Sequence, residues 1–511
     1  MTDSPTTTAT SAASPPPSNG PVVRTEQGLV QGVEENGVFA FKGLRYAAPP
    51  TGRLRWRPPH PPTAWQGIRQ ADSFGPVCPQ RWLPFGPPGW RQEPADEDCL
   101  SLNIWTAAVS ADEKRPVMLW IHGGAFEIGS GSTPAYHGDV LAKKGVVVVT
   151  INYRLGVLGF LAHPELTAES RYSASGNYGL MDMIAALRWV HANIAAFGGD
   201  PHNITIFGES AGGGAVMLLT VSPLAKGLFQ RAISESGAAL PPQARGYKRP
   251  DSAITLAEAE EAGERYMRTI GCSSVDGLRE CPTKEIQEAI MSGTGWPIAD
   301  GHVVPGQVTT LYRAGRQHDV PVLLGWNDNE GGLFAQPTTK ADVEAKIRRE
   351  WGPAAETMFR LYPVADDASA GAVNGTTTAD IGFAWPAWSL AEAQTKTGTA
   401  PAFLYHFTHV PPRTGDSWYK DLPGAQHAEE LAFVFGKGPD IWTEAEHRVA
   451  DAMQNYWINF ARSGDPNGPG VPKWAPYRGD TTVQWFVDGG VRAGDVPRLD
   501  VLRQIDGIVG T

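Results

Sequence analysis

One serine stands in a sequence pattern that supports nucleophilic catalysis. Ser210 is the centre of the pentapeptide GESAG at residues 208–212, which has the G-x-S-x-G pattern of a serine on a tight turn. Apolar residues at 204–207 predict a buried strand before it, and a helix is expected from Ala211. Such a strand–turn–helix unit would present the hydroxyl above a sheet, at a helix N-terminus. The alternative is a glycine-rich turn whose serine is structural.

A serine hydroxyl is a poor nucleophile unless a base stands beside it, and histidine is the usual base. The chain has 12 histidines, so chemistry alone does not select one. In hydrolases with this turn the acid and then the histidine follow the serine along the chain. The histidines far enough downstream are His302, His318, His406, His409, His427 and His447.

A second glycine-rich segment, HGGAF at residues 122–126, follows the apolar run 117–121. Backbone N–H groups of Gly123 and Gly124 at the end of a strand could be aimed at a developing oxyanion. The alternative is a turn whose glycines only permit unusual backbone angles.

Short apolar runs and helical stripes predict the elements that hold these segments. One helix is expected within residues 181–197, ended by the glycine pair at 198–199, and another carries the apolar stripe between Val449 and Phe460. Because strands and helices alternate, we expect an α/β fold with a large, mostly parallel sheet covered by helices on both faces. Its active site should lie at the carboxyl ends of the strands. The predicted strands are 117–121, 146–151, 204–207, 231–234, 320–324 and 402–407.

Composition limits the classes of function. The net charge of -11 and the lack of a basic run argue against a nucleic-acid partner. The longest apolar stretch, residues 145–151, is too short to span a bilayer. Residues 1–20 are rich in Ser, Thr, Pro and Ala and lack the apolar core of a signal peptide, so we expect a disordered tail. Residues 21–511 then form a single domain, either cytoplasmic or from a chain whose signal was removed.

Residues 75–98 hold many prolines and glycines together with the aromatic residues Trp82, Phe85 and Trp90. They predict a surface loop, which is either a rim or lid over the site or a loop packed on the body.

The four cysteines fall into two local pairs. This pattern is consistent with disulfides and a secreted or periplasmic protein, or with free thiols in the cytoplasm.

Nearly the whole chain after residue 21 resembles the type-B carboxylesterase/cholinesterase family of α/β-hydrolases. The resemblance rests on many segments in the family's order, although Arg45 stands where the family usually has proline. The segments are FKGLRYAAPP at 41–50, EDCLSLN at 97–103, HGGAF at 122–126, NYR at 152–154, GNYGLMD at 176–182, FGGDP at 197–201 and FGESAGG at 207–213.

The resemblance implies the remaining site residues. The segment GWNDNEG at 325–331 resembles the family motif that carries the acid, here Glu330, and GAQHAEEL at 424–431 resembles the one that carries the base, here His427. The oxyanion donors would be Gly123, Gly124 and Ala211, and Glu209 would support the site from behind the serine. Asp300 is a rival acid that we interpret as structural. The family's chemistry needs no cofactor or metal.

The resemblance also implies a disulfide between Cys78 and Cys99, and a second, less universal one between Cys272 and Cys281. A non-catalytic, cholinesterase-like binding module would lack part of the triad, whereas all three residues are present here. A metalloenzyme is disfavoured because no HExxH motif occurs.

The ester substrate is open. Trp82 and Trp90 are candidate rim residues that could bind a cation, but Arg81 and Arg91 beside them would repel it. These arginines favour an anionic acyl group, as in the polycarboxylate esters of fumonisins that some bacterial relatives cleave. Lipase or polyester hydrolase activity is a further alternative.

Overall fold

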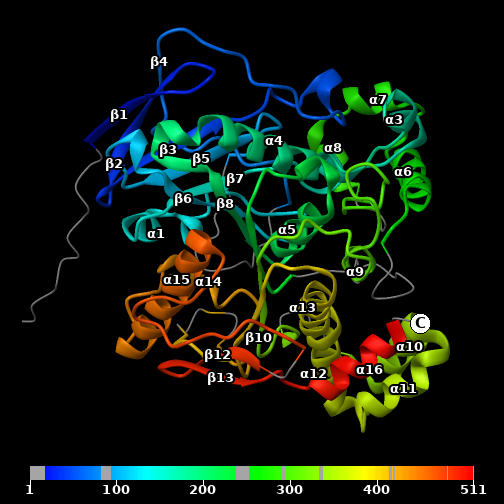
Figure 1. The fold of residues 1–511 in the computed structure, drawn as a ribbon. Helices are drawn as coiled ribbons and strands as arrows, with labels where there is room; N and C mark the ends of the chain where they lie inside the picture. Colours follow the sequence, from blue (N-terminus) through cyan, green and yellow to red (C-terminus); the bar gives the residue numbers. More distant parts are fainter. Residues whose placement is uncertain are drawn as a thin grey trace, which may run out of the picture.

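The computed structural model describes residues 18–81, 94–237, 253–289, 294–332, 338–413, 417, 420–479 and 482–509. Within these residues the chain builds one 13-stranded sheet in the order β1-β2-β3-β5-β7-β6-β8-β9-β10-β11-β12-β13, with β4 paired to β2 (Figure 1). The strands are β1 (Ser18–Arg24), β2 (Leu29–Glu35), β3 (Val38–Arg45), β4 (Ile68–Gln70), β5 (Ser101–Thr106), β6 (Arg115–Ile121), β7 (Val147–Ile151), β8 (Gly199–Glu209), β9 (Arg231–Glu235), β10 (Val322–Asn327), β11 (Ala402–Phe407), β12 (Thr482–Val487) and β13 (Gly490–Asp495).

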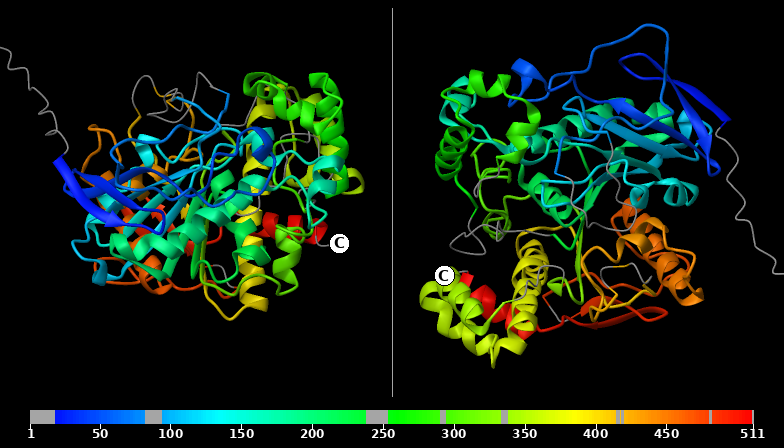
Figure 2. Two further views of the ribbon diagram at one scale, coloured as in Figure 1. Left: turned by 90° about the horizontal axis from the view of Figure 1, so that it is seen from above. Right: turned by 180° about the vertical axis from the view of Figure 1, so that it is seen from behind.

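Helices separate most of the central strands along the chain. Figure 1 shows α10, α11, α12 and α16 together at one corner of the molecule, and the right view of Figure 2 shows the same group from behind. The helices are α1 (Asp139–Lys143), α2 (Gly156–Phe160), α3 (Pro164–Glu169), α4 (Tyr178–Asn193), α5 (Ala211–Val221), α6 (Leu256–Ile270), α7 (Val275–Glu280), α8 (Thr283–Glu288), α9 (Val308–Arg313), α10 (Lys340–Trp351), α11 (Ala355–Leu361), α12 (Asp367–Ala379), the π-helical turn η9 (Asp380–Ala384), α13 (Trp385–Thr397), α14 (Leu431–Phe435), α15 (Glu444–Ser463) and α16 (Leu499–Val509).

The predicted strands form the parallel centre of the sheet. The run β7-β6-β8-β9-β10-β11-β12 is parallel throughout, and it contains all six apolar segments read from the sequence. Alternate residues of β6 point into different cores. Val117 and Leu119 join the core that includes α4 and α5, whereas Met118 and Trp120 join the core that includes α14 and α15. The expectation of helices on both faces is therefore confirmed.

The two predicted helices are also present. The helix expected within residues 181–197 is α4, which begins earlier, at Tyr178, and continues into a 3-10 turn that ends at Phe197. Gly198 then takes a φ of 79°, the left-handed conformation that ends helices. The stripe from Val449 to Phe460 lies on α15, whose N-cap Thr443 forms a capping box.

The flanks of the sheet were not predicted. On one flank the pairs β1–β2, β2–β3, β3–β5 and β5–β7 are antiparallel. On the other flank β13 pairs antiparallel with β12. Residues 18–20, which the sequence assigned to the disordered tail, belong to β1, because Ser18 pairs with Glu34 of β2. Residues 1–17 lie outside the described part of the chain.

Within the described residues, no helix has both the length and the apolar character that are needed to cross a membrane.

Candidate active site

Ser210 occupies a strained turn between a buried strand and a buried helix. β8 ends at Glu209, α5 begins at Ala211, and Ser210 between them takes φ 55° and ψ -124°. This region of backbone space is unfavourable for a residue with a side chain, and such strain is concentrated at functional sites. Ser210 N–H donates to the carbonyl of Glu235 at 2.9 Å, which ties the turn to the end of β9. Ser210 is half-buried between the fully enclosed residues Glu209 and Ala211.

Glycines make this turn possible. A Cβ atom on Gly212 would overlap the carbonyl oxygen of Ile121 at the end of β6. A Cβ on Gly237 would overlap the carbonyl oxygen of Ser210. Both positions therefore need glycine, because backbone atoms of neighbouring segments occupy the space of a side chain.

The HGGAF loop packs directly against the serine. A Cβ on Gly123 would lie 3.1 Å from the Ser210 Cβ, so this backbone approaches the turn closely. Three successive residues have positive φ, at 103° for Gly124, 56° for Ala125 and 58° for Phe126. The loop is anchored at His122, whose carbonyl accepts a hydrogen bond from the Tyr153 hydroxyl at 2.8 Å.

His122 itself is a structural residue. Its ring stacks on Tyr153 at a centroid distance of 4.4 Å, and burial lowers its pKa to about 4. The imidazole is therefore neutral at physiological pH and carries no charge toward the loop.

Glu330 and His427 meet in the loops that follow β10 and β11. Oε2 of Glu330 lies 2.6 Å from Nδ1 of His427, and both residues are buried. The other carboxylate oxygen accepts the backbone N–H of Asn327 at 2.6 Å. A β-bridge between Asn329 and Gln426 ties the two loops together. The structure therefore brings Glu330 and His427 into contact, although they are far apart in sequence.

Glu209 lies nearer to the base than expected, with Oε1 at 3.1 Å from His427 Nε2. An imidazole contact favours the ionised carboxylate, whereas burial, Glu330 and Glu235 favour the neutral acid. Burial and then these two carboxylates raise the pKa of Glu209 well above its usual value, and we take the neutral form as dominant. A neutral Glu209 has a proton to donate. Nε2 can accept it when the ring proton of His427 lies on Nδ1, the nitrogen that contacts Glu330.

A buried carboxyl that sequence reasoning missed, Glu235, lies directly behind the serine turn. Its backbone carbonyl binds Ser210, and its side chain accepts the indole N–H of Trp457 from α15 at 2.7 Å. Burial raises the pKa of Glu235 to about 8. Its position at the end of a buried apolar run, 231–235, was the available signal.

Phe383 is the other missed neighbour. It lies in the π-helical turn η9, and its ring centroid is 4.9 Å from that of His427. A π-helical turn inserted between α-helices is frequently found at functional sites, because the extra residue redirects a side chain.

The rival acid Asp300 has a structural environment. Its Oδ1 accepts the backbone N–H groups of His302, Val303 and Val304 at 2.8–3.1 Å. The candidate rim residues Trp82 and Trp90 lie in the segment 82–93 of the loop 75–98, which is outside the described residues.

The predicted disulfides are not formed in the structure, where all four cysteines are free thiols. The partners are nevertheless as expected: Cys78 is hydrogen-bonded to Cys99, and the sulfur atoms of Cys272 and Cys281 lie 3.1 Å apart. Hydrogen bonding to Cys272 and then burial raise the pKa of Cys281 to about 11. The thiol–thiol contact and burial likewise raise the pKa of Cys99.

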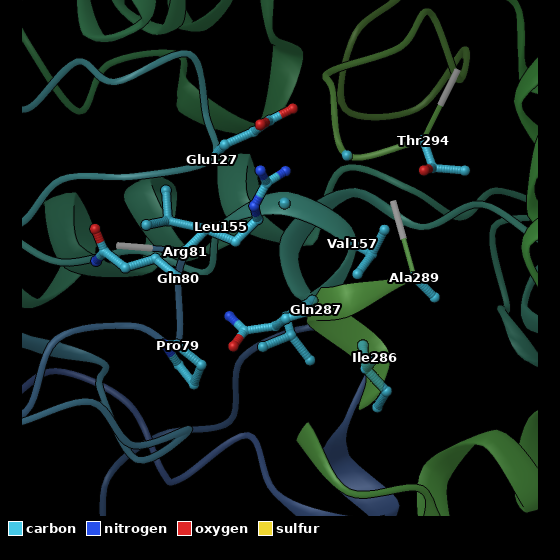
Figure 3. Close-up of a pocket in the computed structure, with 13 residues that line it drawn as sticks. Pro79, Gln80, Arg81, Glu127, Leu155, Val157, Ile286, Gln287, Ala289 and Thr294 are labelled. Carbon is cyan, nitrogen blue, oxygen red and sulfur yellow. The ribbon is translucent and has the colours of Figure 1, made fainter. Parts of the chain in front are cut away.

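A small cavity of about 50 Å³ lies next to the HGGAF loop (Figure 3). Its lining includes Arg81, Gln287 and Thr294, and also Glu127, which directly follows the loop. In Figure 3 the guanidinium of Arg81 lies on the side of the cavity that carries Glu127. Of the two arginines noted beside the candidate rim residues, Arg81 lies within the described residues, and it lines the cavity next to the HGGAF loop.

A serine on a strained strand–helix turn, at the carboxyl edge of a mostly parallel sheet with helices on both faces, defines an α/β-hydrolase. The chain belongs to the carboxylesterase family, whose model matches residues 19–487. It is therefore a serine hydrolase that acts on carboxylic esters.

Similar proteins agree with this assignment. The fumonisin B1 esterase of Sphingopyxis macrogoltabida is 36% identical, over 91% of this chain and 86% of its own. The para-nitrobenzyl esterase of Bacillus subtilis is 34% identical, over 94% and 97%. Among solved structures, a PNB esterase matches with a TM-score of 0.81 at 33% identity, covering 95% of this chain and 99% of its own. A Geobacillus stearothermophilus carboxylesterase matches with a TM-score of 0.79 at 36% identity, with the same coverage.

The raised pKa of Glu235 predicts a pH-dependent stability. The native state holds this proton up to about pH 8, whereas the unfolded chain releases it near about pH 4.5. Between these values the native state binds more protons, so the contribution is complete at acid pH and is lost as the pH rises. From about pH 6 to about pH 9 the wild type should lose roughly 2 kcal/mol more free energy of unfolding than Glu235→Gln, measured by urea denaturation.

The matched control for this comparison is Glu261→Gln, an exposed glutamate on α6. It should follow the wild-type profile. Parallel profiles for wild type and Glu235→Gln would mean that Glu235 is already ionised at neutral pH.

Proposed function

We propose that Ser210 is the nucleophile, His427 the general base and acid, and Glu330 the residue that orients the imidazole. Ser210 Oγ attacks the ester carbonyl while His427 Nε2 takes the hydroxyl proton, and the same nitrogen then returns it to the leaving alcohol. Water, activated by His427, hydrolyses the acyl-enzyme. The observation that carries this proposal is the 2.6 Å contact between Glu330 Oε2 and His427 Nδ1, which fixes the tautomer that leaves Nε2 to accept a proton.

The oxyanion of the tetrahedral intermediate would be bound by the backbone N–H groups of Gly123, Gly124 and Ala211. Two features support this assignment. The Gly123 backbone packs against Ser210, and Ala211 is the first residue of α5, where backbone N–H groups have no partner within the helix. Loss of one such donor costs about 3 kcal/mol of transition-state stabilisation in related acyl-transfer reactions.

Nε2 of His427 contacts Glu209 in the resting structure. We therefore propose that Glu209 positions the imidazole before substrate binds, and that the Ser210 hydroxyl replaces this contact when the proton is transferred. A neutral Glu209 serves this role without competing with Glu330 for the positive charge that develops on the ring.

Replacing Ser210 by alanine tests the nucleophile. The variant should lose hydrolysis of p-nitrophenyl esters by a factor on the order of 10⁵ in kcat, because no other group can form the acyl-enzyme. Its thermal unfolding should match the wild type. Ser463→Ala, at the exposed end of α15, is the matched control and should keep full activity. Wild-type turnover by a folded Ser210→Ala enzyme would remove Ser210 as the nucleophile.

Two amide substitutions identify the acid. Glu330→Gln should lower kcat roughly 10⁴-fold, since the uncharged amide no longer stabilises the imidazolium. Asp300→Asn should leave kcat within about tenfold of wild type, because its carboxylate accepts hydrogen bonds from backbone N–H groups and from the Asn177 side chain. Steady-state kinetics with p-nitrophenyl butyrate measure both, and the opposite ranking would assign the acid to Asp300.

For the substrate, we propose an ester whose acyl group carries a carboxylate. The supporting observation is Arg81, which lines the cavity beside the HGGAF loop together with the amide of Gln287 and the hydroxyl of Thr294. A guanidinium binds a carboxylate through paired N–H donors. A relative named for fumonisin B1 is among the similar proteins, which is consistent with this substrate class.

A matched pair of substrates tests this proposal. Arg81→Gln should lower kcat/KM for monoethyl glutarate about tenfold and leave that for ethyl valerate unchanged, as followed by acid release in a pH-stat. Arg265→Gln, an exposed arginine on α6, serves as the charge-matched control. A loss that is equal for both esters would assign Arg81 a structural role.

A further inference from the structure

A second, larger concavity lies on the less buried face of α4. It has a volume of about 530 Å³, within the usual range of small-molecule sites, and shares no lining residue with the proposed catalytic groups. Its floor includes Met181 and Ile184 of α4, and its walls come from the segment 56–61 and from residues 166–174 around the end of α3. We call it the α4 groove.

The α4 groove is positively charged in an acidic protein. Among the described residues that line it, Arg57, Arg171 and Arg188 are the arginines and Glu169 is the carboxylate. Glu169 is already engaged, because it contacts Arg57 at 3.0 Å and Arg279 at 2.7 Å. Ion pairs within the described part of the chain do not include Arg171 or Arg188. The groove therefore has an excess of positive charge, whereas the net charge of the whole chain is -11.

Arg171 and Arg188 are held by groups that leave their charge uncompensated. The Arg171 guanidinium lies 4.6 Å from the ring centroid of Tyr172, whose ring stacks on His302 at 3.9 Å. Arg188 donates one hydrogen bond to the carbonyl of Leu224 at 3.3 Å. A guanidinium has five N–H donors, so both of these exposed side chains retain donors for an anion.

The wall of the groove is fixed to its floor by a buried ion pair. Arg154 forms a bidentate contact with Asp182 of α4, with distances of 2.7 and 2.8 Å, and donates a further hydrogen bond to the Arg57 carbonyl at 2.9 Å. Trp56 has a φ of 55° and donates its indole N–H to Val157 at 2.8 Å. The segment that carries Arg57 is thus rigidly connected to α4, so the groove is formed before any ligand arrives.

We propose that the α4 groove is a binding site for a small organic carboxylate with an apolar body. Arg171 and Arg188 bind the carboxylate, and the apolar body rests on Met181 and Ile184. Every ester hydrolysis releases a carboxylic acid that is ionised at neutral pH, so the enzyme itself produces this class of ligand. The site is separate from the catalytic groups and does not depend on the proposed substrate.

Isothermal titration calorimetry of the full-length enzyme with 2-naphthoate tests this site. We expect saturable binding, with 2-naphthamide at least roughly tenfold weaker because it lacks the charge. Inorganic phosphate should also bind weakly, since it lacks the apolar body. The double variant Arg171→Gln/Arg188→Gln should weaken 2-naphthoate binding roughly tenfold or more and keep wild-type kcat/KM for p-nitrophenyl acetate.

The control double variant is Arg265→Gln/Arg268→Gln, which removes two exposed charges from α6 and should leave 2-naphthoate binding unchanged. Arg188→Gln alone provides the same test with a milder change. Undiminished binding by the groove variants would place 2-naphthoate outside the α4 groove and overturn the proposal. Equal binding of the acid and the amide, or the absence of binding by wild type, would overturn it as well.

Discussion

The steric constraint at the end of β8 governs the rest of the structure. Ser210 can leave the strand and enter α5 within a single residue only because the neighbouring segments approach without side chains, at Gly212 and Gly237. The parallel sheet is what brings Ile121 of β6 and Glu235 of β9 to either side of this turn. The serine is thus strained, yet held by contacts from two adjacent strands. The backbone conformation of Ser210 therefore depends on the close packing of the neighbouring segments, and not on the serine alone.

Charge distribution behind the turn follows from the same packing. Four glutamates, at 209, 235, 330 and 430, are buried around the base, where four negative charges would repel one another strongly. Burial and the neighbouring carboxylates raise the pKa values of Glu209 and Glu430 well above normal, and burial raises that of Glu235 to about 8. Donors reach both oxygens of Glu330, from His427 and from the Asn327 backbone, and these contacts hold it against the imidazole.

Sequence reasoning located the parallel strands because strands covered on both faces are continuous apolar runs, such as 117–121 and 402–407. It missed the edge strand β13, whose residues are exposed or partly exposed and give no such signal. That Glu330 and His427 act together was predicted from the resemblance of their segments to family motifs. Their spacing along the chain gives no such signal. Contacts made only by folding, such as Phe383 against His427 or Trp457 against Glu235, had no counterpart in local sequence.

The order of the strands has a consequence for biosynthesis. The residues proposed for the reaction follow β8, β10 and β11, which are separated along the chain by long helical segments although β9 alone lies between β8 and β10 in the sheet. A nascent chain on the ribosome therefore exposes its serine long before the histidine has been synthesised. The enzyme is inert while it is being made, and esterase activity arises only when the C-terminal strands have been added. Recovery of activity after denaturation would accordingly report on assembly of the whole central sheet.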